Sequence, residues 1–262
     1  MKLSIITVNL NNRDGLQKTI DSVICQTFRD FEWIVIDGGS TDGSKELIER
    51  YSDHFAYWVS EPDKGIYNAM NKGIKVAKGE YLQFLNSGDW LYNEHSLLSI
   101  FEKDPTEDFV YGENCGLSGR VEGIGSPTKL DFEFLYRYTI CHQDIFHKRN
   151  LFSNELYDER YKIVADWKFL FENIVHKGAS YRKIETIVCG IQEGASYDDS
   201  GIDLERVAAI NEIYSPMEIS VINDHFNSKS GNSQSELYIK YIEKHPLLKK
   251  TLNHIARQFS YK

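Results

Sequence analysis

Residues 79–90 read GEYLQFLNSGDW, and this stretch decides the fold. Residues 80–85 form a short, largely apolar run that is typical of strands covered on both faces, and it stops at the turn-forming residues 86–89. Ligands of parallel sheets bind at the carboxyl ends of the strands. We therefore expect Asp89, the acid in this turn, to face a binding site at the edge of a sheet.

The first hundred residues repeat this pattern of a strand, a polar strand end and a helix. Strand-like runs lie at residues 3–8, 33–36 and 55–59, and runs with helical spacing of apolar residues lie at 16–24, 44–51 and 66–77. Such repeated units predict a parallel sheet with right-handed crossovers. Polar clusters follow the strands at residues 9–12, 37–42, 61–64 and 86–89. Their recurrence predicts one composite site.

The rest of the chain has a looser pattern. After residue 105 it passes through shorter strand-like runs and glycine-rich turns, and residues 166–175 have the apolar spacing of a helix. Residues 229–262 carry seven Lys and Arg against two Asp and Glu, in a protein of net charge −9. This basic segment is either a solvated terminal helix or a contact for a membrane surface or a partner.

The composition disfavours several classes of function. A net charge of −9 argues against nucleic-acid binding, which needs a basic footprint, so we expect no nucleic-acid partner. Four widely spaced Cys without a CxxC pair argue against a zinc or redox site and favour a reducing cytoplasm. The N-terminus turns polar too early for a signal peptide, and no stretch approaches the roughly 18 apolar residues of a membrane span. We expect a soluble cytoplasmic protein, at most peripheral to a membrane.

Four segments in order resemble the donor half of glycosyltransferase family 2: SIITVNLNN (4–12), VIDGGSTDGS (35–44), SEPDKGIYNAMNKGI (60–74) and GEYLQFLNSGDW (79–90). The resemblance extends over residues 1–195. It implies the GT-A fold of nucleotide-diphospho-sugar transferases, an α/β fold with a mostly parallel central sheet flanked by helices. It also divides the chain into a donor-binding half at residues 1–105, an acceptor-binding half of the same domain at 106–200 and a helical C-terminal extension at 201–262.

The resemblance further implies the reaction. An inverting hexosyl- or hexosaminyltransferase would move a sugar from a nucleotide-sugar, with a UDP-sugar favoured, to a hydroxyl of a saccharide or lipid-linked saccharide. Soluble bacterial members of this type often assemble surface polysaccharide or lipopolysaccharide. The basic segment at residues 229–262 would suit peripheral contact at the inner face of the cell membrane.

Five polar residues of the first strand ends and helices are candidates for donor binding. Thr7 and Asn9 can supply hydrogen bonds to a base and ribose, and Asp37 can accept from a base N–H or a ribose hydroxyl. Asp37 has the alternative of a turn or cap aspartate, because its segment is rich in turn formers. Asp63 either binds the base or ribose or is an acid at a helix N-terminus. Lys72 either approaches the diphosphate or is a solvated lysine.

The segment 86–89 stands where GT-A enzymes carry a DxD-type metal motif. Ser87 occupies the first acidic position, so Asp89 is the single predicted metal ligand, and Asn86 is assigned to the donor. Mn²⁺ or Mg²⁺ prefers hard oxygen ligands and would bridge this carboxylate to the diphosphate. The alternative for Asp89 is a turn residue.

The catalytic base is expected on the acceptor side. Asp166 begins the helix predicted at 166–175 and resembles the family's base, with an N-cap aspartate as its alternative. His142 and Gln143 lie in a segment that resembles the HQ motif of many members and would contact the sugar or diphosphate. A buried, hydrogen-bonded histidine is the alternative. Tyr67 either stacks on a ring of the ligand or packs beside the site.

Two other functions remain open. A nucleotidyltransferase uses similar sheets and metals, but it normally has a glycine-rich loop with a basic residue after the first strand, and residues 9–15 are a poor version of it. A non-catalytic nucleotide-sugar-binding protein would share the fold. The presence of both Asp89 and Asp166 disfavours this second alternative, because a sensor needs no base.

Overall fold

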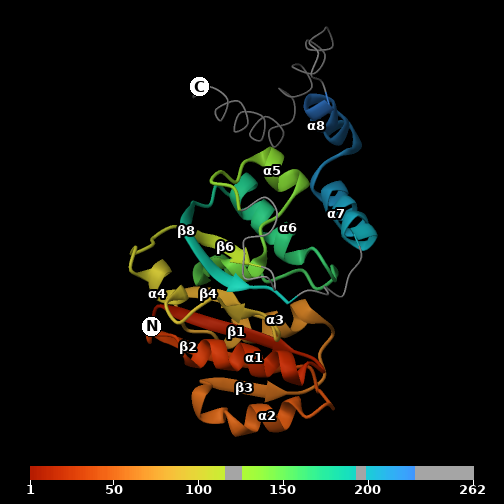
Figure 1. The fold of residues 1–262 in the computed structure, drawn as a ribbon. Helices are drawn as coiled ribbons and strands as arrows, with labels where there is room; N and C mark the ends of the chain where they lie inside the picture. The colour runs from red at the N-terminus through yellow and green to blue at the C-terminus, as the bar shows by residue number, and fades with distance from the viewer. Residues whose placement is uncertain (116–125, 193–198, 228–262) are drawn as a thin grey trace.

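A computed structural model of the chain describes residues 1–115, 126–192 and 199–227. Its centre is one eight-stranded sheet with the strand order β3-β2-β1-β4-β7-β6-β8-β5. Figure 1 labels β1 to β4, β6 and β8 and the helices around them. The strands are β1 Leu3–Asn9, β2 Phe31–Asp37, β3 Tyr57–Ser60, β4 Tyr81–Phe84, β5 Trp90–Leu91, β6 Phe109–Cys115, β7 Ile145–Lys148 and β8 Tyr181–Gly190. The four strands predicted from the sequence are thus β1 to β4.

Helices connect these strands and extend beyond them. They are α1 Arg13–Ile24, α2 Ser44–Arg50, α3 Ile66–Val76, α4 Ser96–Phe101, α5 Phe132–Arg137, α6 Ala165–Phe171, α7 Asp199–Ile213 and α8 Pro216–Asn227. Short 3-10 turns lie at Ser52–His54, His142–Asp144 and Arg149–Phe152, and the π-helical turn Glu172–His176 continues α6. The helices predicted at 16–24, 44–51, 66–77 and 166–175 correspond to α1, α2, α3 and α6 with its π-helical turn.

The two halves of the sheet differ in strand direction. Strands β3, β2, β1 and β4 pair in parallel, as the repeated β-α-β units predict. Strand β7 then runs antiparallel to both β4 and β6, β8 is parallel to β6, and β5 is antiparallel to β8. The α/β fold is therefore confirmed, and the sheet is parallel in its first half and mixed as a whole.

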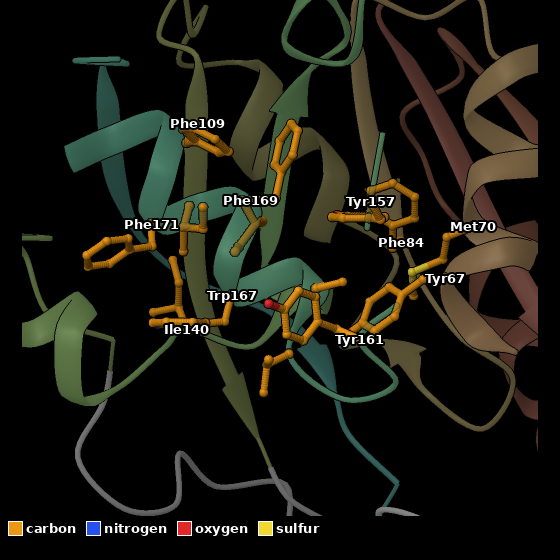
Figure 2. Packing of buried hydrophobic residues seen from close by; sticks show 14 of the residues in the cluster. Tyr67, Met70, Phe84, Phe109, Ile140, Tyr157, Tyr161, Trp167, Phe169 and Phe171 are labelled. Carbon is orange, nitrogen blue, oxygen red and sulfur yellow. The ribbon is translucent and has the colours of Figure 1, made fainter. Parts of the chain in front are cut away.

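Helices cover both faces of the sheet, and each face has its own core. Strand β1 is buried along its whole length because alternate side chains enter different cores. Leu3 and Ile5 pack with α1, α2 and α4, whereas Ile6 and Val8 pack with α3, α5 and α6. The second core is rich in aromatic rings (Figure 2), and Tyr67 on α3 belongs to it.

The C-terminal part of the described chain is helical. Helices α7 and α8 pack against each other, and Ala209, Ile210 and Ile222 join the core beside α5 and α6. The basic segment predicted as a membrane or partner contact falls in residues 228–262, outside the described residues. The division at residues 105 and 200 stays a prediction. In the part of the chain that the structure describes, no helix has the length and apolar character needed to cross a membrane.

Candidate active site

Most of the predicted site residues converge on one cavity of about 660 Å³. Seven predicted site residues line it: Asn9, Asp63, Asn86, Asp89, His142, Gln143 and Asp166. The first four lie at or after the ends of strands in the parallel half, and the others come from the 3-10 turn before β7 and from the start of α6. Both halves of the sheet therefore contribute to one cavity. Of the four polar clusters from which a composite site was predicted, those at residues 9–12, 61–64 and 86–89 contribute lining residues, and the one at 37–42 does not.

Asp89 sits in a tight loop directly after β4. Gly88 has φ +102, a conformation that glycine adopts easily, and the Asp89 residue that follows is only 6% exposed. Gln143 Nε2 donates to Oδ2 at 2.9 Å, and the backbone N–H of Gln192 donates to Oδ1 at 3.0 Å. Burial raises the pKa of Asp89, and these two hydrogen bonds oppose the shift. Each carboxylate oxygen keeps one further lone pair for a ligand.

Helix α1 holds the backbone of this loop. The Thr19 hydroxyl donates to Asp89 O at 2.7 Å and accepts from Gly88 N at 3.0 Å. Asn12, the N-cap of α1, donates from Nδ2 to Ser87 O at 2.9 Å. Three hydrogen bonds from one helix thus fix the loop that carries the predicted metal ligand.

His142 connects the Asp89 side of the cavity to Asp166. Its Nε2 lies 3.0 Å from Asn86 Nδ2, and its Nδ1 lies 3.3 Å from Asp166 Oδ2. The side chains of His142 and Asp166 are both 17% exposed, so water screens their interaction only partly. The geometry therefore makes the pair a charge-assisted contact inside the cavity.

Asp166 accepts hydrogen bonds on both oxygens. The Tyr67 hydroxyl donates to Oδ1 at 2.7 Å, and the Trp167 backbone N–H donates to the same oxygen at 2.9 Å. Burial alone would raise the pKa of Asp166, but the hydrogen bond and charge of His142, with the Tyr67 hydroxyl, lower it below its ordinary value. Asp166 is therefore an ionised carboxylate at neutral pH, able to accept a proton.

The same contact acts on His142 in the opposite direction. Burial alone would lower its pKa, but the hydrogen bond and charge of Asp166, together with Asp89 and Asp144, raise it above 6.5. Asn86 Oδ1 is a buried oxygen that accepts from no donor among the described residues. If the Asn86 amide is rotated by half a turn, this oxygen faces His142 Nε2 and can accept from it when the ring is protonated.

A pH titration of His142 tests this pairing. The stability that the pair supplies is fully present below the ordinary histidine pKa of 6.5 and is lost as pH rises through the raised value. We expect the NMR titration midpoint of the His142 ring to lie above 6.5 in the wild type and to fall in Asp166→Asn. The variant lacks the carboxylate charge that opposes the lowering of the His142 pKa by burial. Asp131→Asn, at the N-cap of α5, is the control and should leave the midpoint unchanged. A wild-type midpoint below 6.5 contradicts the pairing.

Three predicted donor residues do not line the cavity. Thr7 is fully buried, and its hydroxyl accepts from Trp33 Nε1 at 3.0 Å. Lys72 pairs with Glu61 at 2.7 Å and donates to Pro62 O at 3.2 Å, so it holds the loop after β3. In this structure neither side chain points its polar end at the site.

Asp37, the third of these residues, is buried among its own neighbours. It accepts from Asn9 Nδ2 at 2.7 Å, from the Ser40 hydroxyl at 2.5 Å and from the Ser60 hydroxyl at 2.6 Å. Burial would raise the pKa of Asp37, but the hydrogen bonds from Ser40, Ser60 and Asn9 outweigh it, and the pKa is lowered. This geometry favours the turn alternative: Asp37 orients Asn9, which itself reaches the cavity.

The cavity lining also includes Lys162 and Gln192, which the sequence did not single out, and Asp63 and Tyr67, which it did. Only the backbone N–H of Gln192 makes the contact to Asp89. Asp63 lines the cavity and accepts from Gly65 N at 2.8 Å, so it also organises the start of α3. Tyr67 lies at the cavity with its hydroxyl on Asp166. A polar strand-end signal cannot find Lys162 or Gln192, because neither follows a strand of the parallel half.

The donor set suits a metal that is completed by another ligand. Within residues 1–115, 126–192 and 199–227, no group of three His, Cys, Asp or Glu side chains could hold a metal ion. Asp89 offers a hard carboxylate with spare lone pairs, which fits Mg²⁺ or Mn²⁺ bound mainly by phosphates and water. The cavity can therefore hold an anionic group beside Asp89 and, beside Asp166, a nucleophile that loses its proton to this carboxylate.

Sequence comparison identifies the relatives of the chain. The model of the family described as "Glycosyl transferase family 2" matches residues 4–114. A PGL/p-HBAD biosynthesis glycosyltransferase of Mycobacterium tuberculosis is 32% identical over 210 residues, which cover 77% of this chain and 81% of that protein. An uncharacterized glycosyltransferase of the same species is 32% identical over 215 residues, 78% of each chain.

Solved structures share the fold. S. aureus TarS 1–349 in complex with UDP superposes with a TM-score of 0.65 at 19% identity, over 100% of this chain and 73% of that one. The mannosyltransferase PcManGT from Pyrobaculum calidifontis, in complex with GDP-Man and Mn²⁺, gives 0.55 at 16% identity, over 100% and 76%. The predicted GT-A fold is therefore confirmed. With relatives of 32% identity across more than three quarters of its length, the chain belongs to glycosyltransferase family 2 and is a glycosyltransferase.

Proposed function

We propose that the protein transfers a sugar from a UDP-sugar to a hydroxyl acceptor with inversion at the anomeric carbon. The observation that carries this proposal is the placement of two carboxylates, Asp89 and Asp166, in one cavity with His142 between them. Family membership decides against the nucleotidyltransferase and the non-catalytic alternatives.

The donor would occupy the side of the cavity built from the parallel strands. Asn9, Asp63 and Asn86 supply hydrogen-bonding groups there, and Asp89 lies at the end of β4. A uridine nucleotide is favoured because TarS was solved with UDP and with UDP-GlcNAc, although PcManGT was solved with GDP-Man. Asp89 would hold Mg²⁺ or Mn²⁺ against the diphosphate, and the ion would neutralise charge on the leaving group.

Asp166 would act as the general base. The acceptor hydroxyl oxygen forms a bond to the anomeric carbon, the bond from that carbon to the diphosphate oxygen breaks, and the hydroxyl proton moves to Asp166. Tyr67 and the Trp167 N–H both bind Oδ1, which leaves a lone pair on Oδ2, beside His142, for the incoming proton. A single displacement of this kind needs no covalent enzyme intermediate.

The acceptor is proposed to be a saccharide or lipid-linked saccharide in the assembly of surface polysaccharide or lipopolysaccharide. The relatives named for PGL/p-HBAD biosynthesis support a role in building glycans. Peripheral contact with the inner face of the membrane through residues 229–262 belongs to the same proposal and rests on their seven basic against two acidic residues.

A donor screen followed by product analysis tests the proposal. Thermal shift is measured with UDP-glucose, UDP-galactose, UDP-GlcNAc and GDP-mannose, each with and without Mn²⁺. A ligand at a hundred times its Kd should stabilise the protein by about 2.7 kcal/mol, and we expect this for a UDP-sugar with Mn²⁺. Transfer is then followed as UDP release with a bacterial lipid extract as acceptor. A product with the anomeric configuration of the donor, seen by proton NMR, would exclude inversion.

A further inference from the structure

Helix α3 binds the loop that leads to Asp166. Asn71 Nδ2 donates to Tyr157 O at 2.9 Å, and Asn71 Oδ1 accepts from Tyr157 N at 3.0 Å. Further along the loop, the Tyr67 hydroxyl lies 2.6 Å from Ile163 O as well as 2.7 Å from Asp166. These contacts fix the loop against the donor half, but they leave the N–H groups beside Ile163 to another partner.

Glu205 on α7 is that partner. The backbone N–H groups of Lys162 and Ile163 each donate to its carboxylate at 2.8 Å, and that of Val164 donates at 3.2 Å. Three consecutive N–H groups that converge on one carboxylate form a nest, which is a strong site for an anionic group. Glu205 on α7 therefore binds the turn at residues 162–164.

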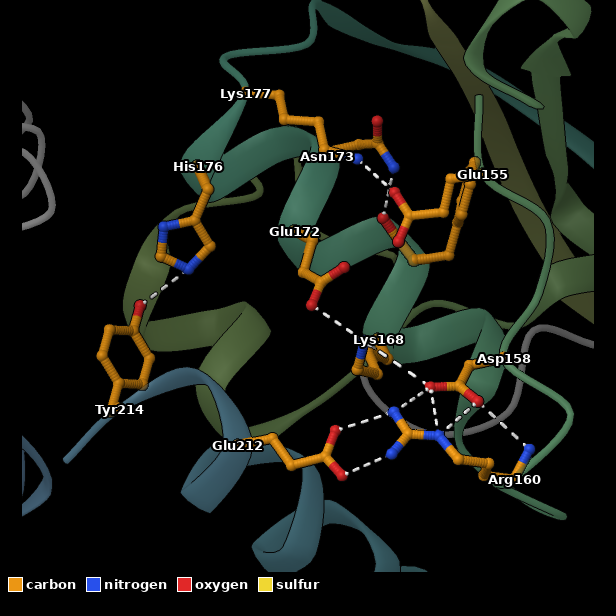
Figure 3. A network of polar contacts seen from close by, with 11 residues as sticks. Glu155, Asp158, Arg160, Lys168, Glu172, Asn173, His176, Lys177, Glu212 and Tyr214 are labelled. Atoms are coloured by element: carbon orange, nitrogen blue, oxygen red, sulfur yellow. Dashed lines mark hydrogen bonds and ion pairs between the residues drawn. The ribbon is translucent and has the colours of Figure 1, made fainter. Parts of the chain in front are cut away.

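Two further contacts dock α7 on the same region. The Arg206 guanidinium carbon lies 5.0 Å from the centre of the Trp167 ring, next to Asp166 in the chain. Arg160 makes two hydrogen bonds of 3.0 Å to Glu212, one from each terminal nitrogen (Figure 3). Helix α7 thus contacts the chain on both sides of the 162–164 turn.

This turn has a direct role in the cavity. Lys162 and Ile163 line it, and Val164 is the N-cap of α6, two residues before Asp166. We propose that Glu205 is a positioning residue: its carboxylate fixes the 162–164 turn and so holds Asp166 in the geometry needed for proton transfer. The proposal rests on the proposed role of Asp166 as base. It makes the C-terminal extension part of the acceptor side of the site.

Glu205→Ala in the full chain tests the proposal. We expect UDP release in the transfer assay to fall by about ten- to hundredfold in kcat, because small misplacements of a catalytic group have effects of that size. The Kd of UDP with Mn²⁺ should stay unchanged, since Glu205 accepts its hydrogen bonds from residues 162–164 and not from the proposed donor-binding residues. Sodium formate should restore part of the rate by placing a carboxylate in the vacated nest. The kcat of Glu205→Gln, which keeps one acceptor oxygen, should lie between the kcat of the wild type and that of Glu205→Ala.

Asp203→Ala is the matched control, because it removes an exposed carboxylate from the same helix. A fall in rate of equal size in this control would overturn the proposal, as would a Glu205→Ala rate within twofold of the wild type. Formate can replace a missing carboxylate but cannot refold a chain, so rescue separates the proposed role from a loss of folding. A rate that formate does not restore would therefore also overturn the proposal. If Asp166→Asn retained full transfer in the same assay, the proposed function itself would fail, whatever the result at Glu205.

Discussion

Asp166→Asn should reduce transfer by about a hundred- to ten-thousandfold, the range that a general base contributes. Asparagine keeps the size of the side chain and an oxygen that can accept from the Tyr67 hydroxyl and the Trp167 N–H. It cannot take a proton from an acceptor hydroxyl at neutral pH. UDP release in the transfer assay measures the loss, and calorimetry with UDP and Mn²⁺ should give a Kd close to that of the wild type.

The control for this change is Asp131→Asn at the N-cap of α5, where asparagine is as good a cap as aspartate. It should leave both transfer and UDP binding unchanged. If Asp166→Asn weakened UDP binding as strongly as it reduced transfer, Asp166 would be a donor-binding residue and not the base.

Asp89→Ala should remove the dependence of UDP affinity on Mn²⁺. In the wild type we expect Mn²⁺ to strengthen UDP binding, because the ion would join the Asp89 carboxylate to the diphosphate. Without the carboxylate, the ion would be bound by phosphate and water alone, so UDP titrations with Mn²⁺ and with EDTA should give similar Kd values. Asp89→Asn, which keeps an acceptor for the Gln192 N–H, separates the loss of charge from collapse of the loop.

Wild-type UDP affinity that does not change between Mn²⁺ and EDTA would contradict the metal assignment. It would leave Asp89 as a buried loop acid that orients Gln143 and Gln192. The raised pKa of Asp89, caused mainly by burial, would then describe a carboxylate with no metal ion to stabilise its charge.

The sequence predicts the parallel half of the fold well because its signals are local. Each strand from β1 to β4 is a short apolar run followed by turn formers, and each helix between them has one apolar face. The mixed half could not be predicted in the same way. On the side away from β1, strand β4 pairs with β7, which lies more than sixty residues later in the chain. No local sequence pattern gives the direction of β7.

The same distinction explains which site residues were found. Asn86 and Asp89 lie in a turn that the sequence marks, and they line the cavity. Thr7 has the right place in the chain, but side chains alternate along β1, and Thr7 shares the face of Leu3 and Ile5, toward Trp33. Asp37 is buried because Ser40, three residues later, and Asn9 and Ser60, on the neighbouring strands, all donate to its carboxylate.

Long-range contacts account for what the sequence did not indicate. The Tyr67 hydroxyl reaches Asp166 from 99 residues away, and Glu205 reaches Lys162 from 43 residues away. Each partner has an ordinary local interpretation, as a core tyrosine or a helix glutamate. The sequence indicates that Tyr67 lies near the site, but only the packing of α3, α6 and α7 around one loop gives its contact with Asp166 and the contact of Glu205 with residues 162–164.

The conformation of Gly88 limits how this site could be redesigned. A side chain at position 88 would start 1.8 Å from Gln192 Oε1, on a backbone whose φ of +102 L-residues rarely adopt. An engineer who wished to add a second carboxylate for tighter ion retention therefore cannot place it there without rebuilding the loop. Position 87, where serine stands, is the remaining place for it between Asn86 and Asp89.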